Sequence, residues 1–170
     1  MPMTRTIQIG AAILVMMAGL AACSERASEP TSPAAAEADI AAIRAVLEHI
    51  EHTFQSGDLD AAMTVFTDDA VIMGQGAPDV VGTEAIRTMY AGMMNQFDIA
   101  ADLSSDEIEV SGDHAYERGT YTLILTDKAS GQIALDVENR YIHIFERQPD
   151  GAWKTWRMMV NSAEPAPATP

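Results

Sequence analysis

Residues 56–73 read SGDLDAAMTVFTDDAVIM, and this stretch contains a helix end, a helix start, a second helix end and the beginning of a strand. Glycine readily adopts the left-handed conformation that ends a helix, so Gly57 is expected to terminate the helix before it. Asp58 has a side chain suited to cap the helix that follows. The apolar run Ala70–Met73 then predicts a buried strand.

The N-terminal residues 1–22 have the pattern of an export signal. Arg5 supplies a positive start, and the apolar stretch from Ile7 to Leu20 is too short for an ordinary membrane-spanning helix. The signal ends in Leu-Ala-Ala-Cys, which resembles the lipobox of bacterial lipoproteins. The alternative is an ordinary secretory signal in which Cys23 is incidental. We favour the lipoprotein, because Cys23 is the only cysteine and follows the small residues that direct cleavage.

The lipobox resemblance implies that the signal is removed before Cys23 and that this cysteine carries lipid, including palmitate. Several acyl chains hold a protein stably on a membrane where one chain does not. We therefore expect a lipid-anchored protein of the cell envelope that faces the periplasm. Ser24 stands where an aspartate would imply retention in the inner membrane, so the resemblance favours the outer membrane.

The chain has 170 residues and a net charge of −15, which excludes some classes of partner. Removal of residues 1–22 takes away Arg5 and no acidic residue, so the mature protein is more negative still. Nucleic acids and anionic lipid headgroups are both bound through basic patches. We therefore expect no nucleic-acid partner and no direct electrostatic docking on a membrane.

Composition divides the mature chain into a tether, one domain and a tail. Residues 23–37 are rich in Ser, Pro, Ala and Glu and predict a lipidated, disordered tether. Residues 38–162 form the folded domain, which opens with a helix from about Glu37 to Gln55, and residues 163–170 form a second disordered end. Such a domain is long enough to bury a core without a disulfide.

A third helix is expected to start at Thr83, with this residue as its N-cap. Its methionines, Met89, Met93 and Met94, recur at helical spacing. Thioethers suit Cu(I), but no His or Cys joins the cluster. We therefore interpret these methionines as core and pocket-wall residues, and we predict neither a metal nor a cofactor.

From residue 99 onward the apolar pattern changes to a period of two, which predicts long antiparallel strands. These strands are expected at Ala100–Val110, His114–Thr126, Gln132–Glu146 and Trp153–Asn161. A short strand at Val80-Val81 is expected to pair with the first strand. Three helices cannot cover both faces of such a sheet, so they should pack on one face in an α+β fold.

This order of elements resembles the nuclear transport factor 2-like superfamily, in its branch of ketosteroid isomerases and SnoaL-like polyketide cyclases. The resemblance covers 38–162 and is carried by GDLD at 57–60, FTDDA at 66–70, GTEAI at 82–86 and DGAWK at 150–154. It implies a cone-shaped, curved antiparallel sheet with three helices packed on its concave face. One end of this cone would open to an apolar pocket.

The resemblance to the isomerases extends to the fold but not to their catalytic residues. Those enzymes use an aspartate base, with a tyrosine and a protonated aspartate that stabilise the oxyanion. The tyrosine position falls on Ile50, the base position on Gly74, and the second aspartate near Tyr141. None of the three positions carries its required group, although Tyr141 can donate a hydrogen bond. Steroid isomerisation by that mechanism is therefore not expected.

The third long strand places Asn139, Tyr141 and His143 on one face, which we expect to point into the pocket. The complete predicted lining is Met73, Tyr90, Tyr121, Asn139, Tyr141, His143, Trp156 and Met158. An apolar cavity with a few polar groups is typical of a small-ligand site. The opposite face of the strand, with Arg140 and Ile142, is better suited to solvent or to a partner subunit.

His143 is the one histidine with a candidate role as an acid or base. The alternative is a core histidine bonded to a neighbour, which we favour because the sequence identifies no partner carboxylate. His49 and His52 lie towards the polar side of the first helix and are interpreted as surface residues. Asp68-Asp69 is interpreted as the turn into the first strand rather than as a catalytic pair.

We therefore predict a lipid-anchored accessory domain that binds a small apolar or amphipathic molecule and forms a homodimer through its outer sheet face. The alternative is a cofactor-free, SnoaL-like isomerase, cyclase or hydrolase-like enzyme that uses His143 with Tyr141 or Asn139. A third possibility is an interaction module whose pocket is filled by its own methionines.

Overall fold

The structure is a computed structural model that describes residues 32–163. The predicted signal peptide, Cys23 and the tail beyond residue 163 lie outside the described residues. Within the described part, no helix is both long and apolar enough to cross a bilayer.

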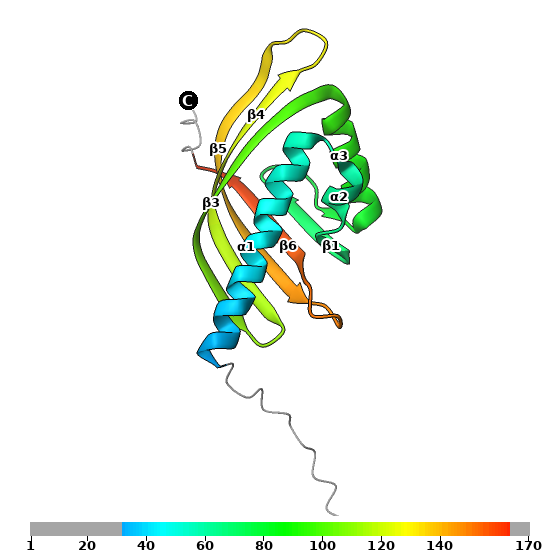
Figure 1. Ribbon diagram of the computed structural model, residues 1–170. Coiled ribbons are helices and arrows are strands. Elements are labelled where there is room, and N and C mark those ends of the chain that lie inside the picture. The colour runs from blue at the N-terminus through cyan, green and yellow to red at the C-terminus, as the bar shows by residue number, and fades with distance from the viewer. Residues whose placement is uncertain (1–31, 164–170) are drawn as a thin grey trace, which may run out of the picture.

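Three helices and six strands form one α+β domain, as predicted. They follow in the order α1 (Pro33–Ser56), α2 (Leu59–Met63), β1 (Phe66–Gly74), β2 (Val80–Val81), α3 (Thr83–Gln96), β3 (Phe97–Ser111), β4 (His114–Asp127), β5 (Ile133–Arg147) and β6 (Trp153–Ser162). The strands make a single sheet in the order β2-β1-β6-β5-β4-β3. Neighbouring strands are antiparallel except β1 and β6, which are parallel. The sheet curves around the helices, which lie on its concave face (Figure 1).

Helix α1 begins earlier than the sequence pattern predicts. It starts at Pro33, inside the segment predicted to be a disordered tether, and not at Glu37. The physical reason is local: proline pre-sets the helical φ at the first position, and the Ser32 side chain accepts a bond from the Ala35 amide at 3.3 Å. The helix ends as predicted at Gly57, which has a φ of 70°.

A charged clamp holds the N-terminal half of α1 against the sheet. The guanidinium of Arg147 donates to both carboxylate oxygens of Asp39, at 2.7 and 2.6 Å. The same guanidinium lies 4.3 Å from the centre of the Trp153 ring, whose indole also donates to Asp39. The hydrogen bonds to Arg147 are the main reason that the pKa of Asp39 lies below its usual value.

The stretch after α1 forms α2 as predicted, but the first strand is longer. Asp58 accepts a bond from the Ala61 amide at 3.0 Å and so caps α2. Strand β1 starts at Phe66 rather than at Ala70, and its pairing with β6 has an irregularity before Val71.

The pair Asp68-Asp69 therefore lies inside β1 and is not a turn into it. Both residues are exposed. Asp69 joins two strands, because its carboxylate accepts a bond from the Trp156 indole of β6 at 3.0 Å. This hydrogen bond between strands gives Asp69 a structural role in the sheet.

Helix α3 also starts differently from the prediction. Its N-cap is Gly82, with a φ of 83°, and Thr83 is the first helical residue. In the part of the chain that the structure describes, no side chain caps this helix. Strand β2 pairs with β1 through Val71 and Ile72, as predicted.

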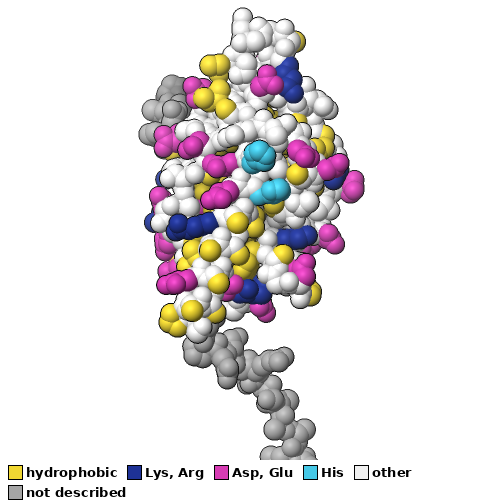
Figure 2. All heavy atoms as spheres, in the orientation of Figure 1, with side chains coloured by type: hydrophobic (Ala, Val, Ile, Leu, Met, Phe, Trp, Pro, Cys, Tyr) yellow, Lys and Arg dark blue, Asp and Glu magenta, His cyan; other side chains and the backbone are white. Residues whose placement is uncertain are grey.

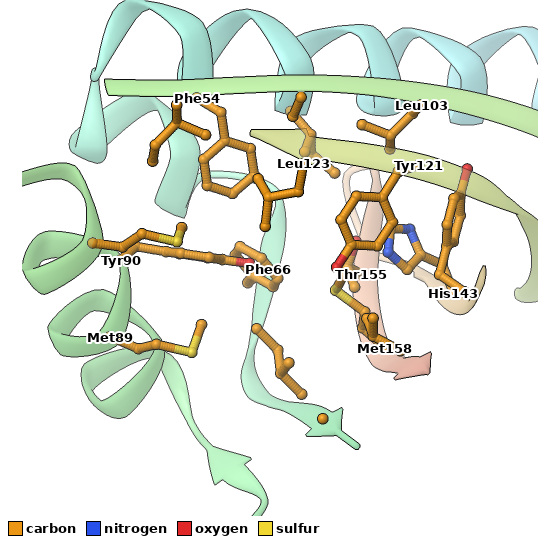
Figure 3. Close-up of a pocket in the computed structure, with 18 residues that line it drawn as sticks. Phe54, Phe66, Met89, Tyr90, Leu103, Tyr121, Leu123, His143, Thr155 and Met158 are labelled. Carbon is orange, nitrogen blue, oxygen red and sulfur yellow. The ribbon is translucent and has the colours of Figure 1, made fainter. Parts of the chain in front are cut away.

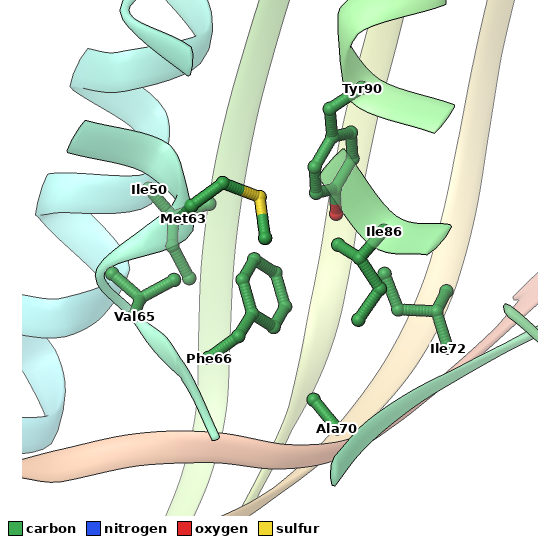
Figure 4. Packing of buried hydrophobic residues seen from close by; sticks show 8 residues of the cluster. All are labelled: Ile50, Met63, Val65, Phe66, Ala70, Ile72, Ile86 and Tyr90. Atoms are coloured by element: carbon green, nitrogen blue, oxygen red, sulfur yellow. The ribbon is translucent and has the colours of Figure 1, made fainter. Parts of the chain in front are cut away.

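The core that positions the site joins α1, α2, β1 and α3 (Figure 4). Its buried members are Ile50, Met63, Val65, Phe66, Ala70, Ile72, Ile86 and Tyr90. Tyr90 contacts Phe54 of α1 edge to face, with ring centres 4.9 Å apart. These contacts fix α3 over the end of the sheet, away from the clamp on α1.

Acidic side chains are spread over the surface that carries α1, with Lys and Arg side chains scattered between them (Figure 2). The two histidines of α1, His49 and His52, are exposed, as predicted.

Candidate ligand-binding pocket

A cavity of about 250 Å³ lies between the C-terminal part of α1, helix α3 and the concave face of the sheet (Figure 3). Most of its wall is aliphatic, aromatic or thioether. It is lined by Ile50, Phe54, Phe66, Ile72, Gly74, Met89, Tyr90, Met93, Ile99, Ala101, Leu103, Tyr121, Leu123, Tyr141, His143, Thr155, Met158 and Val160.

The structure brings together most of the residues that the sequence pattern assigned to the pocket. Tyr90, Tyr121, Tyr141, His143 and Met158 all line the cavity. They come from helix α3 and strands β4, β5 and β6, so the cavity is built from elements spread over the second half of the chain.

Three positions identified through the isomerase resemblance lie in the cavity wall. Ile50, Gly74 and Tyr141 all contribute to the lining. Two of these residues are aliphatic or lack a side chain, so the wall has no acid or phenol at either position. The three residues therefore meet in one cavity wall, with Tyr141 as the one hydrogen-bonding side chain among them.

Met73 and Trp156 do not line the cavity, and both predictions are wrong. On β1, alternation turns Ile72 and Gly74 inward, which leaves Met73 on the other face. On β6, the pairing with β5 passes from Arg157 directly to Thr155, so Trp156 is the extra residue of a bulge. This bulge reverses the alternation.

Because of the bulge, Trp156 lies on the outer side of β6. The guanidinium of Arg157 lies 3.9 Å from the centre of its ring. Thr155, which the sequence analysis did not select, takes the inward position and lines the cavity.

Asn139 lies on the inward side of β5 but does not line the cavity, so that prediction is also wrong. It pairs with Tyr121 across the β4–β5 ladder, and a polar interaction with its side chain lowers the pKa of Tyr121. Burial nevertheless raises the pKa of Tyr121. Asn139 therefore supports the wall from beyond its edge.

Behind the cavity wall lies a buried carboxyl group that the sequence analysis missed. Glu117 of β4 is 0 % exposed and pairs across the ladder with His143, which is 2 % exposed. The Tyr141 hydroxyl donates to Glu117 Oε1 at 2.7 Å. His143 Nδ1 lies 3.8 Å from Glu117 Oε2, which is too long for a hydrogen bond.

Burial shifts the pKa of each member of this buried group. Desolvation raises the pKa of Glu117, against the opposing effect of its bond from Tyr141. Desolvation lowers the pKa of His143 to about 4. The pKa of Tyr141 is raised, first by burial and then by its bond to Glu117. Both the acid and the imidazole are thus pushed towards their uncharged forms, and we interpret the 3.8 Å contact as a carboxyl group beside a neutral imidazole.

Several polar atoms of this region have no hydrogen-bond partner within residues 32–163. They are Glu117 Oε2, both ring nitrogens of His143, and Thr155 Oγ1. Buried polar groups in proteins are nearly always hydrogen-bonded, so such a set needs an explanation. His143 and Thr155 line the cavity, so a molecule inside it would lie next to the side chains that carry three of these four atoms.

Gly119 is the residue that allows this arrangement. A Cβ atom at this position would lie 2.1 Å from the backbone oxygen of Ser104 and 2.9 Å from the Tyr141 hydroxyl oxygen. Strand β3 and the Tyr141 hydroxyl therefore approach β4 at a point where no other residue fits. The signal in the sequence is a glycine within a long strand, which often marks a close approach.

Within the described residues, no group of three or more His, Cys, Asp or Glu side chains is placed to hold a metal ion. Among the side chains of the cavity wall, His143, Thr155 and the tyrosine hydroxyls can form hydrogen bonds, and His143 can exchange a proton.

Comparisons with known proteins agree with this architecture. The model of a family described as the SnoaL-like domain matches residues 36–159. No curated protein matches the chain by sequence.

Solved structures of similar proteins cover most of the described domain. A ketosteroid isomerase-like protein from Erwinia carotovora atroseptica is 25 % identical, with a TM-score of 0.63 over 75 % of this chain and 98 % of that one. A proposed aromatic ring hydroxylase from Novosphingobium aromaticivorans is 26 % identical, with a TM-score of 0.67 over 76 % and 92 %. An NTF2-like protein with a cystatin-like fold from the same organism is 21 % identical, with a TM-score of 0.65 over 76 % and 85 %.

Proposed function

This chain belongs to the SnoaL-like domain family, and on that premise we propose that it binds a small apolar or amphipathic molecule in the cavity beside His143. Membership alone does not decide an activity, because folds of this kind host many unrelated functions. The observation that carries the proposal is an apolar cavity whose wall includes buried polar groups that have no partner among the described residues.

The size of the cavity supports a compact ligand. An apolar protein cavity of about 150 Å³ is large enough to hold benzene. A cavity of about 250 Å³ therefore has room for a somewhat larger body, of one or two rings or a short branched chain. The space is left although Met89, Met93 and Met158 are in its wall, which argues against a pocket filled by its own methionines.

Binding can be tested by filling the cavity. Met89→Trp places a large ring in the wall of α3, and the matched control Met159→Trp makes the same change on the outer face of β6, where Met159 is 52 % exposed. We expect naphthalene, used as a probe, to bind the wild type and the control but not Met89→Trp in calorimetric titrations. Equal binding by all three proteins would contradict the proposal.

A second candidate function is favoured by Glu117. Glu117 Oε2 lies 3.8 Å from His143 Nδ1, so an ionised Glu117 would stabilise the imidazolium that forms when His143 accepts a proton. This supports a cofactor-free enzyme in which a neutral His143 accepts a proton from a bound molecule. Asn139 has no part in this version, since it lies outside the cavity lining. A bound compound that exchanges a C–H proton for deuterium in wild type but not in His143→Phe would support it.

We also propose that the chain is exported, lipidated on Cys23 and held at the periplasmic face of the outer membrane. This rests on the lipobox-like sequence before Cys23 and on Ser24. Cys23→Ser should move the protein from the membrane fraction to the soluble fraction. A variant that stays with the membrane would refute the lipid anchor.

Finally, we propose a homodimer formed through the outer face of the sheet. Ile142 and Met159 pair across β5 and β6 and are 46 % and 52 % exposed, which makes an apolar centre on that face. Native mass spectrometry should give twice the chain mass for wild type and the single mass for Ile142→Asp. A monomeric wild type would rule out the dimer.

A further inference from the structure

We infer that the molecule bound in the cavity carries one uncharged oxygen group, a hydroxyl or a carbonyl, and that this group contacts His143 and Thr155. The inference rests on the proposed ligand-binding function and specifies the chemistry of the ligand. It starts from two residues of the cavity wall, His143 and Thr155, whose buried polar atoms have no partner within residues 32–163: both ring nitrogens of His143 and Thr155 Oγ1.

His143 and Thr155, whose polar atoms have no partner within residues 32–163, lie together at one end of the cavity. Figure 3 shows His143 and Thr155 close together beside Tyr121, whereas Phe66 and Met89 lie towards the other end. A ligand that bonds to His143 and Thr155 and packs against Phe66 and Met89 therefore has an apolar body and a polar end. This matches the amphipathic shape expected from the lining as a whole.

The polar end is held rigidly, which allows it to select a ligand. The rings of Tyr141 and Phe145 flank His143, with centres 4.9 and 5.6 Å from it. The Thr155 amide donates to the carbonyl of Val65 at 2.7 Å, beside the bulge that turns Thr155 inward. Because these side chains are already held in place, little conformational entropy is lost when a ligand binds to them.

The charge of the site excludes ionised ligands. Within residues 32–163, no Lys or Arg side chain lines the cavity, so a carboxylate would be buried there without a counter-charge. Glu117 also does not line the cavity, so a ligand ammonium group would find no carboxylate in contact. A neutral polar group has neither problem.

The donor and acceptor properties of the two side chains then select an oxygen. A neutral imidazole presents one N–H donor and one bare nitrogen that accepts, and a threonine hydroxyl both donates and accepts. A ligand hydroxyl can donate to the bare nitrogen while it accepts from Thr155. A carbonyl can accept from either residue.

The inference can be tested with three probes that share one ring system: naphthalene, 2-naphthol and 2-naphthoate. Isothermal titration of the purified full chain at pH 7 should give about tenfold tighter binding of 2-naphthol than of naphthalene, since one well-made hydrogen bond supplies about that factor. 2-Naphthoate should bind at least about tenfold more weakly than naphthalene, because its charge is buried without a partner.

Two variants test whether Thr155 and His143 make the polar contact with the ligand. Thr155→Val keeps the shape of the side chain and His143→Phe keeps a ring, and each should reduce the preference for 2-naphthol over naphthalene several-fold while naphthalene still binds. The matched control is Thr53→Val, because this buried hydroxyl of α1 is already bonded to the Ile50 carbonyl at 2.9 Å and does not line the cavity. It should leave the preference unchanged.

The outcomes separate the two proposals. Equal binding of naphthalene and 2-naphthol by the wild type would overturn the oxygen inference and leave the ligand-binding function intact. A preference for 2-naphthoate, or a naphthol preference that survives both variants, would also overturn the inference. Failure of all three probes to bind would overturn the proposed function together with it. The wild-type comparison needs no variant, so it decides the matter even if His143→Phe does not fold.

Discussion

Gly119→Ala should destabilise the protein strongly, although it adds a single methyl group. The new Cβ would lie 2.1 Å from the Ser104 carbonyl oxygen, which belongs to the backbone of β3 and cannot rotate away. It would also lie 2.9 Å from the Tyr141 hydroxyl oxygen. Overpacking of a core by one methylene costs about 1–3 kcal/mol, and here the contact is with backbone. We therefore expect a loss of about 3 kcal/mol or more in the free energy of unfolding.

The assay is urea unfolding followed by circular dichroism, with Gly92→Ala as the matched control. A Cβ at Gly92 meets nothing within 4 Å, and the residue lies in the exposed face of α3. Alanine is favoured over glycine in a helix by about 0.5–1 kcal/mol, so the control should be slightly more stable than wild type.

The same substitution should thus have opposite signs at the two glycines. Neither Gly119 nor Gly92 has a positive φ, so backbone strain does not contribute at either site. If Gly119→Ala unfolds within about 1 kcal/mol of wild type, the close approach of β3 and β4 is not what requires a glycine. The account of how Tyr141 reaches Glu117 would then be wrong.

Three further predictions concern the buried polar group and the α1 clamp. Tyr141→Phe should cost about 1–3 kcal/mol of unfolding free energy, because it removes the 2.7 Å hydrogen bond to buried Glu117. The control Tyr116→Phe removes a hydrogen bond nearer the surface and should cost less in the same urea titration. His143, with a pKa of about 4 when folded against an ordinary 6.5, binds fewer protons in the folded state, so stability should fall as pH drops from 6.5 to 4. The raised pKa of Glu117 acts in the opposite sense, so the measured quantity is the difference between wild type and His143→Phe, and equal pH slopes would contradict the shift. Arg147→Lys should lower the free energy of unfolding by about 1–3 kcal/mol, since an ammonium group cannot make two parallel hydrogen bonds to the Asp39 carboxylate. An unchanged urea midpoint would show that the clamp contributes little to stability.

Much of the fold follows from local features of the sequence. Gly57 ends α1 and Asp58 caps α2 because a cap depends on a few neighbouring residues. The four long strands follow from alternation of period two, and their bounds differ from the predicted ones by a few residues. The start of α1 at Pro33 was missed although its signal, a serine before a proline, is local as well.

Local features of the sequence predict only part of the candidate site. Alternation on β5 correctly put Tyr141 and His143 on the inward face. The same reasoning failed on β6, because a bulge at Trp156 reverses the alternation and exchanges its place with Thr155. A bulge is a property of two paired strands, so the sequence of one strand alone does not predict it.

Residues 56–73 and the alternating strands that follow thus determined, without the structure, an α+β domain with its helices on one face of the sheet. Only the tertiary structure decided that Glu117 lies opposite His143 and receives the Tyr141 hydroxyl. The physical reason is the range of the interactions. Caps and periodicity act over one or two turns of chain, whereas the register between β4 and β5, which brings an acid to an imidazole, is set by the packing of the whole sheet.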